Sequence, residues 1–379
     1  MNAVGVWGTG RYVPARVRSN AEVAAGTGVT PEWIAERTGV RRRHVADGSQ
    51  AASDLAAEAV RRALASAGVT ARQLGLLVCA TSTPDELGPA TACRVQALVG
   101  AADAVALDVS AACSGWLFGA KVAHDWLREA DGPMLAVVVG VEAYSKFLDP
   151  ADRATAVLFA DGAAATVLGP VEPPGGLGGF RLGSDGRLAD RVLIPAGGSR
   201  RPATRQTLAE GAHRIRMDGR TVSRFIRDAF PRMLGETLER HGLTTDDIDH
   251  VITHQPNPVL VRRLAAEAGL ADRMTVVGDL VGNIGAASAP YALATAHAEG
   301  RLQPGDLILL TVFGAGMTWG SALLRWSETS SETSSETSSE TSSETRPEAR
   351  PETRPGSRTD TGAGTGTDPH RTERKEELS

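Results

Sequence analysis

The chain has 379 residues, of which 42% are hydrophobic and 22% are charged, the balance of an ordinary folded protein. Its net charge of −5 provides no strong positive field, which argues against a general nucleic-acid binder. Its three cysteines are too few for a disulfide framework and fit a reducing compartment.

The first residues, MNAVGVWGTGRYVP, lack the basic start and long apolar core of a signal peptide. No apolar run in the sequence reaches the length that spans a membrane. We therefore expect a cytoplasmic protein with no membrane partner and no nucleic-acid partner.

Two stretches of the chain have the same order of predicted elements: amphipathic helix, glycine stop, short loop, buried strand. The first stretch begins at Ser53 and the second at Arg224. Gly68 corresponds to Gly242 and Ala80 to His254, an offset of 254 − 80 = 174 residues. The apolar runs MLAVVVGVE and DLILLTVFG form a further pair. Helices alternating with apolar strands predict a duplicated α/β protein with helix-covered parallel sheets, its halves being residues 1–175 and 176–326.

Cys113 lies in DVSAACSGW, where a strand-like stretch turns through small residues into an apolar helix. A thiol in the first turn of a helix feels the partial positive charge of unpaired backbone amides, which predicts a lowered pKa and a usable nucleophile. The small residues around it leave room for a substrate carbonyl. The alternative is a buried core cysteine, since free cysteine is among the most buried residue types.

Three further segments are unusual for packing: His254 in THQPN, Asn283 in VGNIGAAS, and the glycine-rich FGAGMTWG. We expect each to follow a strand, and ligands of open parallel sheets bind at the carboxyl ends of strands. A Cys, a His and an Asn that converge there supply a nucleophile, an acid/base or donor, and a neutral oxyanion donor. Taken singly, a histidine at a strand end is more often a structural hydrogen-bonding residue, and an asparagine in such a loop is usually a turn residue.

From Ser327 the composition changes to Ser-Glu-Thr-Ser repeats and then to an Arg/Pro/Glu and Gly/Thr mixture. No apolar stripe exists that could be buried, so ordering this segment would not be compensated. We expect residues 327–379 to be a disordered low-complexity tail without chemistry of its own.

Residues 1–326 resemble the 3-oxoacyl-acyl-carrier-protein synthase III enzymes of the thiolase superfamily. The segments that carry the resemblance, in order, are GTGRYVP, PEWIAERTGVRRRH, PATAC, AACSG, DPADRATAVLFADGA, HQPN, GNIGAAS and FGAGMTWGSAL. The resemblance implies a five-layered αβαβα thiolase-like fold with two duplicated halves, a homodimer, and a catalytic triad of Cys113, His254 and Asn283.

The resemblance also implies how substrates are held. Trp33, Arg37 and Arg153 are expected at the nucleotide end of coenzyme A, where Trp and Arg planes stack on adenine and Arg pairs with phosphate. Asn257 of HQPN is expected among the substrate-binding residues. The backbone amides of Cys113 and Ala315 are expected to form the oxyanion hole. No metal and no cofactor is implied, coenzyme A entering only as the substrate thioester.

The implied reaction has two half-reactions. Cys113 takes an acyl group from acyl-CoA, and a malonyl thioester, carried by an acyl carrier protein, then loses carbon dioxide and attacks the acyl-cysteine to give a 3-oxoacyl thioester. Fatty-acid or polyketide biosynthesis is the expected setting. Two alternatives remain open: an acyltransferase of the same fold with an alcohol or amine acceptor, and a non-catalytic partner subunit.

The chain departs from the family pattern at several positions. Leu87 and Gly88 lie in the loop that gates the acyl pocket, where housekeeping members carry Phe at the position of Gly88. Pro258 and Val259 follow HQPN where an Arg is common, and Gly285 stands where Ser is common. These departures predict a specialised paralogue that accepts acyl groups larger than acetyl. A basic docking surface for the carrier protein would then come from Arg224, Arg262 and Arg263.

Overall fold

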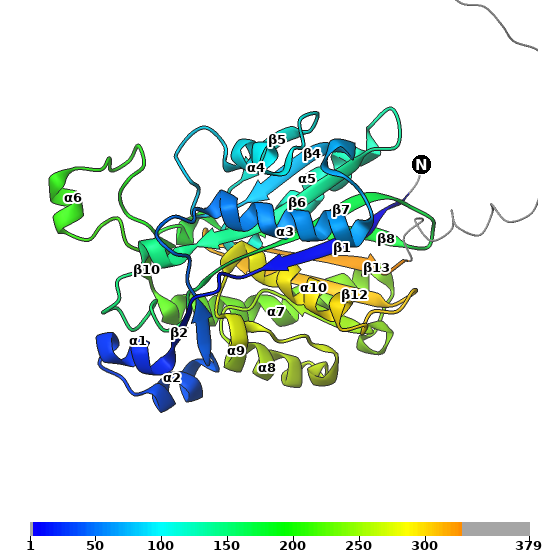
Figure 1. Ribbon diagram of the computed structural model, residues 1–379. Coiled ribbons are helices and arrows are strands. Elements are labelled where there is room, and N and C mark those ends of the chain that lie inside the picture. Colours follow the sequence, from blue (N-terminus) through cyan, green and yellow to red (C-terminus); the bar gives the residue numbers. More distant parts are fainter. Residues whose placement is uncertain (1–2, 328–379) are drawn as a thin grey trace, which may run out of the picture. The chain divides into compact units, whose positions relative to one another are not determined.

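Two sheets form the body of the protein, and the computed structural model describes residues 3–327 (Figure 1). The strands of the first sheet are β1 (Ala3–Tyr12), β4 (Leu74–Ala80), β5 (Val105–Val109), β6 (Leu135–Ala143) and β7 (Asp161–Val171). Their order across the sheet is β1-β7-β6-β4-β5. β4 runs parallel to β5 and β6, whereas β7 is antiparallel to β6 and β1.

The strands of the second sheet are β8 (Gly176–Ser184), β11 (His250–Thr253), β12 (Leu307–Gly314) and β13 (Thr318–Arg325), in the order β11-β12-β13-β8. Only β11 and β12 are parallel. The prediction of parallel sheets is therefore wrong for the pairings made by β7 in the first sheet and by β13 in the second. The turn between β12 and β13 is too short for a crossover, so the chain can only return antiparallel. Two short ribbons complete the strands: β2 (Val17–Ser19) with β3 (Arg42–His44), and β9 (Val192–Leu193) with β10 (Arg216–Met217).

The helices carry most of the predicted amphipathic segments. They are α1 (Asn20–Thr27), α2 (Pro31–Thr38), α3 (Ala52–Ala67), α4 (Thr91–Val99), α5 (Gly115–Arg128), α6 (Arg205–Ala209), α7 (Gly219–His241), α8 (Pro258–Glu267), α9 (Gly278–Val281) and α10 (Ser288–Ala298). Short 3₁₀ turns are η1 (Ala71–Gln73), η2 (Ala112–Ser114), η3 (Tyr144–Phe147), η4 (Gly186–Leu188), η5 (Thr245–Asp247), η6 (Ala271–Arg273) and η7 (Gly285–Ala287).

Helices and sheets stack in five layers, which confirms the predicted thiolase-like fold (Figure 1). α3 and α4 pack on the outer face of the first sheet, and α7 and α8 on the outer face of the second. Between the sheets, α5 and α10 share one core with strands of both, to which they contribute Trp116, Leu117, Ala292 and Leu293 among other residues. The small residues of α10 let it lie close to both sheets, because alanine adds little width to a helix.

The duplication appears in the details of the elements. α3 and α7 both end in a left-handed glycine, Gly68 with φ 67° and Gly242 with φ 64°. A 3₁₀ turn preceded by threonine follows each, and a strand comes next. η2 leads into α5 as η7 leads into α10, so Cys113 and Ala287 occupy matching turns. The offset of 174 residues that the sequence predicts is therefore a structural repeat.

Every strand of the first sheet ends before residue 172, and every strand of the second begins at residue 176 or later. The division into halves at residue 175 stays a prediction that agrees with this distribution. All but the first residue of the predicted tail, residues 328–379, lies outside the described residues. Within residues 3–327, none of the helices combines the length and apolar character that a membrane crossing needs.

Candidate active site

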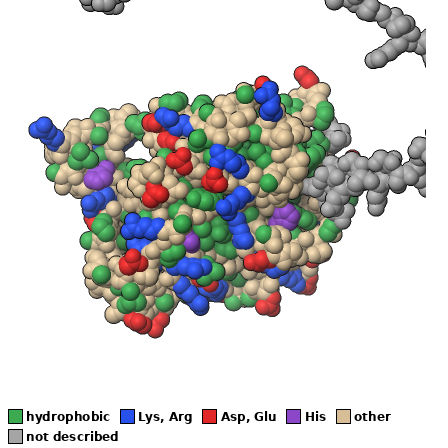
Figure 2. Space-filling view, viewed as in Figure 1, with side chains coloured by type: hydrophobic (Ala, Val, Ile, Leu, Met, Phe, Trp, Pro, Cys, Tyr) green, Lys and Arg blue, Asp and Glu red, His purple; other side chains and the backbone are tan. Residues whose placement is uncertain are grey.

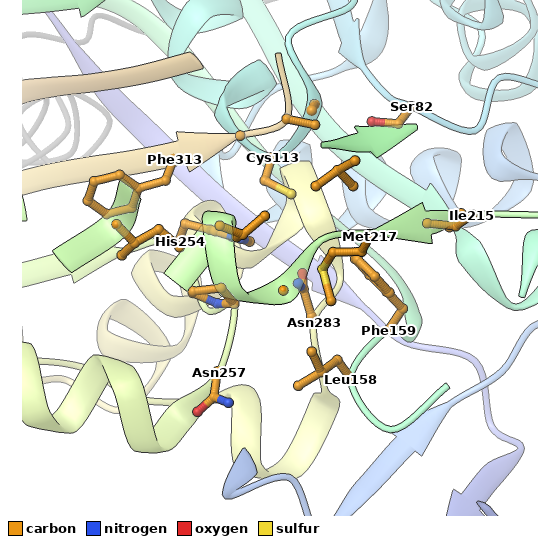
Figure 3. Close-up of a pocket in the computed structure, with 18 of the residues that line it drawn as sticks. Ser82, Cys113, Leu158, Phe159, Ile215, Met217, His254, Asn257, Asn283 and Phe313 are labelled. Atoms are coloured by element: carbon orange, nitrogen blue, oxygen red, sulfur yellow. The ribbon is translucent and has the colours of Figure 1, made fainter. Parts of the chain in front are cut away.

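Cys113 lies in η2, between the end of β5 and the start of α5. The residue before it, Ala112, has φ 47° and is the one non-glycine residue among residues 3–327 with a positive φ. A left-handed alanine costs about 1–3 kcal/mol, and such strain persists where the surrounding structure enforces it. Here the strained turn presents the Cys113 side chain to a cavity (Figure 3).

The end of β12 holds this turn from the opposite side. A Cβ atom at Gly314 would lie 2.7 Å from the Ala111 carbonyl oxygen and 2.8 Å from the Ser114 nitrogen, so only glycine allows so close an approach. The Thr318 hydroxyl donates to the Ala111 carbonyl at 3.1 Å. These contacts bring Ala315 to the wall of the cavity that Cys113 faces.

The thiol of Cys113 has one polar side-chain neighbour within bonding range, the Tyr144 hydroxyl, with 4.0 Å between Sγ and the oxygen. Burial, and to a smaller extent the charge of the nearby Glu142 carboxylate, raise the pKa of Cys113 to about 12. The prediction of a lowered pKa is therefore wrong for the free protein. The thiol lies in a 3₁₀ turn before α5 begins, and the loss of water around it outweighs the helix dipole.

His254 follows β11 and is buried. Its Nδ1 lies 2.6 Å from the Ser288 hydroxyl, which also accepts from the Gln255 backbone nitrogen and donates to the Gly285 carbonyl. When that hydroxyl donates to Gly285, Nδ1 carries the proton and Nε2 is an acceptor. When it donates to Nδ1, Nε2 is a donor. Burial lowers the pKa of His254 to about 3, so the ring is neutral near pH 7 in either arrangement.

Asn283 follows α9 and one glycine, so the expectation that it follows a strand is wrong. Its backbone instead bridges to the segment before β7: its nitrogen donates to the Leu158 carbonyl at 2.8 Å, and its carbonyl accepts from the Ala160 nitrogen at 3.0 Å. Its side-chain oxygen accepts from the Gly285 nitrogen at 3.0 Å. The NH₂ group is thereby left as the donor that the cavity can use.

The three side chains line one cavity of about 290 Å³, shown in Figure 3. Ala315 and Asn257 line it as well. Its other walls are largely apolar and come from Leu158, Phe159, Val192, Leu193, Ile194, Ile215, Met217, Val222, Ile226, Leu260 and Phe313. An apolar channel with a few convergent polar groups is typical of a site that takes an extended, partly apolar substrate.

Asn257 lines the cavity, whereas the residues expected at the nucleotide end of coenzyme A lie outside it. Asn257 caps α8 by accepting from the Leu260 nitrogen, and its amide donates to the Arg37 carbonyl at 3.4 Å, which joins α2 to the cavity wall. Trp33, which also lies on α2, is 38% exposed. Trp33, Arg37 and Arg153 are not among the residues that line the cavity. Their contact with coenzyme A stays a prediction.

The gate residues lie away from this cavity. Leu87 is 84% exposed, and a Cβ atom at Gly88 would have no neighbour within 4 Å. The loop therefore does not close the pocket of its own chain.

Sequence reasoning missed three polar side chains near Cys113: Tyr144, Ser288 and Glu142. Glu142 had a visible signal, since it is the one charged residue in the apolar run LAVVVGVEA. Tyr144 also explains Gly285. A Cβ atom there would lie 2.6 Å from both the Tyr144 hydroxyl and the Glu142 Cγ, and φ is 53°. The glycine at this departure from the family pattern is thus required by its neighbours.

Comparison with known proteins shows the family to which the chain belongs. Residues 107–186 match the family described as 3-oxoacyl-[acyl-carrier-protein] synthase III, and residues 238–326 match its C-terminal part. A beta-ketoacyl-[acyl-carrier-protein] synthase III of Symbiobacterium thermophilum is 43% identical over 327 residues, which cover 86% of this chain and 98% of the relative. The chain belongs to the beta-ketoacyl-[acyl-carrier-protein] synthase III family.

Other relatives show the range of this family. Acetoacetyl CoA synthase NphT7 of a Streptomyces strain is 42% identical over 323 residues, covering 84% of this chain and 97% of that one. The crystal structure of 3-oxoacyl-(acyl carrier protein) synthase III from Pseudomonas aeruginosa is 39% identical, with a TM-score of 0.79 over 86% of this chain and 99% of that one. The priming beta-ketosynthase of the R1128 polyketide pathway is 30% identical, with a TM-score of 0.79 over 86% and 97%. The protein is accordingly an acyl-transferring condensing enzyme that joins an acyl group from acyl-CoA to a malonyl thioester.

Proposed function

We propose that this synthase III enzyme carries out both half-reactions at the cavity in Figure 3, with Cys113 as acyl acceptor and His254 and Asn283 as the groups that serve condensation. The observation that carries the proposal is the convergence of these three side chains from distant segments at one apolar channel. A non-catalytic partner subunit has no need of such a set.

In the first half-reaction the Cys113 sulfur attacks the acyl-CoA carbonyl carbon. The amides of Cys113 and Ala315 hold the tetrahedral oxyanion, and coenzyme A leaves as its thiol. The raised pKa of Cys113 and the lowered pKa of His254 make both groups neutral before reaction. The thiol proton therefore leaves as the carbon–sulfur bond forms, passes by way of the His254 Nε2 acceptor, and ends on the departing coenzyme A sulfur.

In the second half-reaction a malonyl thioester occupies the channel. Its carbon–carbon bond to the carboxylate breaks, carbon dioxide leaves, and the electron pair moves toward the thioester oxygen as an enolate. In the tautomer in which the Ser288 hydroxyl donates to Nδ1, Nε2–H of His254 and the NH₂ of Asn283 donate to that oxygen. The enolate carbon attacks the acyl carbonyl, and the Cys113 sulfur leaves as a thiolate that takes up one proton from solvent water. Because carbon dioxide loss generates the carbanion, no strong base is needed.

We further propose an acyl carrier protein as the carrier of the malonyl group, in keeping with the name of the family. Two of the arginines expected to form a basic docking surface are paired with carboxylates. Arg262 pairs with Asp279, and Arg263 pairs with Glu267. The face in Figure 2 has basic and acidic side chains interspersed, so it presents no field of one sign. Docking would therefore depend on shape and on a few charges at the channel mouth.

The test of the proposal measures carbon dioxide release by acylated enzyme from malonyl-carrier protein and from malonyl-CoA at equal concentration. We expect release from both, with the larger kcat/KM for the carrier protein. Release from malonyl-CoA alone would replace the carrier assignment but keep the mechanism. Release from neither, together with acyl transfer to an alcohol or amine, would overturn condensation as the reaction.

A second copy of the chain is proposed to complete the acyl pocket. β5 is an edge strand that pairs only with β4 among residues 3–327, and Val105 on it is 48% exposed. Leu98 and Leu87 add exposed apolar surface nearby in the sequence. An unpaired edge with apolar neighbours fits strand pairing between two copies. The exposed gate loop would then reach the partner's pocket.

Gly88 then predicts the acyl choice. The missing aromatic side chain leaves space for two to four carbons, and each buried methylene contributes about 0.8 kcal/mol, so longer acyl groups should gain roughly 2–3 kcal/mol. Medium-chain or branched acyl-CoA should outcompete acetyl-CoA for Cys113 by roughly 30-fold or more. Gly88→Phe should restore acetyl preference.

The readout is the mass of the acyl adduct under competition, at concentrations where sedimentation gives a dimer. Acetyl preference that Gly88→Phe leaves unchanged would refute the gate.

A further inference from the structure

Glu142 is a fully buried carboxyl that the two half-reactions do not use. It stands near the end of β6, and both of its oxygens accept from the Ser82 backbone nitrogen, at 3.2 and 3.1 Å. The Thr83 hydroxyl donates to it at 3.0 Å, and the Ala286 nitrogen donates at 3.4 Å. The carboxyl thus connects β6 to the turn after β4 and to η7, which belongs to the other half.

These donors are neutral amides and a hydroxyl. They satisfy hydrogen bonds of a carboxylate, but none of them brings a positive charge to balance its own. The charge of Glu142 therefore acts on its surroundings with little compensation from its bonding partners. In a water-poor site such a charge is felt over several ångströms, because little dielectric screening intervenes.

We propose that Glu142 is a positioning residue that controls the reactivity of Cys113, holding the turns around the site in place and opposing formation of the thiolate when its carboxyl is ionised. This role rests on the proposed function of Cys113 as acyl acceptor. It differs from catalysis by a carboxylate, since Glu142 acts through Cys113 and not on the substrate.

The electrostatics around Glu142 follow from the groups that face it. These are Cys113 of η2, Tyr144 of η3 and Cys79 of β4, whose pKa values all reflect its charge. η7 contributes only small residues without titratable side chains. The Asp161 carboxyl of β7 accepts hydrogen bonds from Ser145 and from the Ala46 nitrogen. Burial keeps the pKa of Tyr144 and of Cys79 well above their usual ranges, so we expect neither group to ionise where Glu142 does.

The order of the two pKa values determines how Glu142 affects thiolate formation at Cys113. Burial raises the pKa of Glu142 to about 8, and that of Cys113 lies higher, at about 12. Below pH 8 the carboxyl is neutral and does not oppose the thiolate. Above pH 8 it is ionised, and each further step in pH yields less thiolate than an isolated thiol would give. The rate at which Cys113 reacts rises with pH, and a plot of this rate against pH therefore has a bend, a decrease in slope, near pH 8.

The experiment follows alkylation of Cys113 by iodoacetamide between pH 6.5 and 9.5, using intact mass, in a Cys79→Ala/Cys93→Ala background. We expect Glu142→Gln and its parent to react at equal rates at pH 6.5. By pH 9.5 the variant should react about tenfold faster, the effect of one pKa unit. The bend near pH 8 should disappear in Glu142→Gln and return in Glu142→Asp.

Thr83 gives a test that leaves the carboxyl in place. Its hydroxyl lowers the pKa of Glu142. Thr83→Val should therefore move the bend to higher pH, whereas Thr83→Ser should not. This pair keeps the proposal testable even if Glu142→Gln does not fold. Thermal melting identifies folded variants.

A rate ratio between Glu142→Gln and parent that is constant over the whole pH range would overturn the proposal, since a purely structural role acts at every pH. A bend that persists in Glu142→Gln would do the same. Because alkylation uses no thioester, these outcomes are independent of whether Cys113 accepts an acyl group. Failure of the proposed function would show instead as a missing acyl adduct.

Discussion

Cys113→Ala is expected to abolish the covalent acyl adduct that forms when the protein is mixed with acyl-CoA. Cys113 has the only thiol among the described residues that line the cavity, because Cys79 is buried in the first sheet and Cys93 is an exposed residue of α4. Alanine removes the attacking atom and adds no strain, since it fits the same 3₁₀ turn. Intact-protein mass spectrometry measures the adduct directly.

Cys79→Ala and Cys93→Ala are the matched controls and should keep the adduct. Cys113→Ser is a second control, since it preserves the shape of the turn while replacing the thiol by a much weaker nucleophile. An adduct on Cys113→Ala, mapped to any other residue, would remove the basis of the mechanism.

Asn283→Ala should separate the two half-reactions. The side-chain oxygen of Asn283 is engaged by the Gly285 nitrogen, which directs the NH₂ group to the substrate side. Loss of one oxyanion donor costs on the order of a hundredfold or more in rate. We expect Asn283→Ala to become acylated at near the parent rate and to release carbon dioxide from a malonyl thioester at least about a hundredfold more slowly.

Asn283→Asp is the informative companion. It retains an oxygen for the Gly285 nitrogen but replaces the donor by an acceptor, so the local turn is preserved and the chemistry is not. It should therefore be as slow in carbon dioxide release as the alanine variant. Near-parent release by either variant would show that Asn283 does not hold the enolate oxygen. Equal loss of acylation would show that the two half-reactions share this group.

The sequence predicted the fold well because its strongest signals are local and repeated. The glycine stops at Gly68 and Gly242 and the apolar strands after them have the same physical cause in both halves. Cys113 was found from its place between a strand and an apolar helix, and His254 was found where the repeat has Ala80 at a strand end. The antiparallel pairings of β7 and β13 were not predictable in this way, since strand direction depends on the length of the connection and not on the apolar pattern.

The pKa shifts in the site could not be predicted from the sequence, for a different reason. The lowered pKa expected for Cys113 followed from the helix start alone, whereas its actual direction is set by burial and by Glu142, 29 positions later. Ser288 and Tyr144 reach the site through the packing of η7 and η3. Such neighbours are distant in the chain, so no spacing rule identifies them.

On the proposed mechanism, the backbone bridge between Asn283 and the Leu158–Ala160 segment joins two halves that depend on each other. The first half alone would possess a nucleophile with nothing to stabilise an enolate, and the second half alone an enolate site with nothing to condense. The reaction therefore requires both halves to be held together, by this bridge and by other hydrogen bonds such as Thr318 to Ala111 and Ala286 to Glu142. Substitutions that loosen these bonds should lower turnover even where each half still folds.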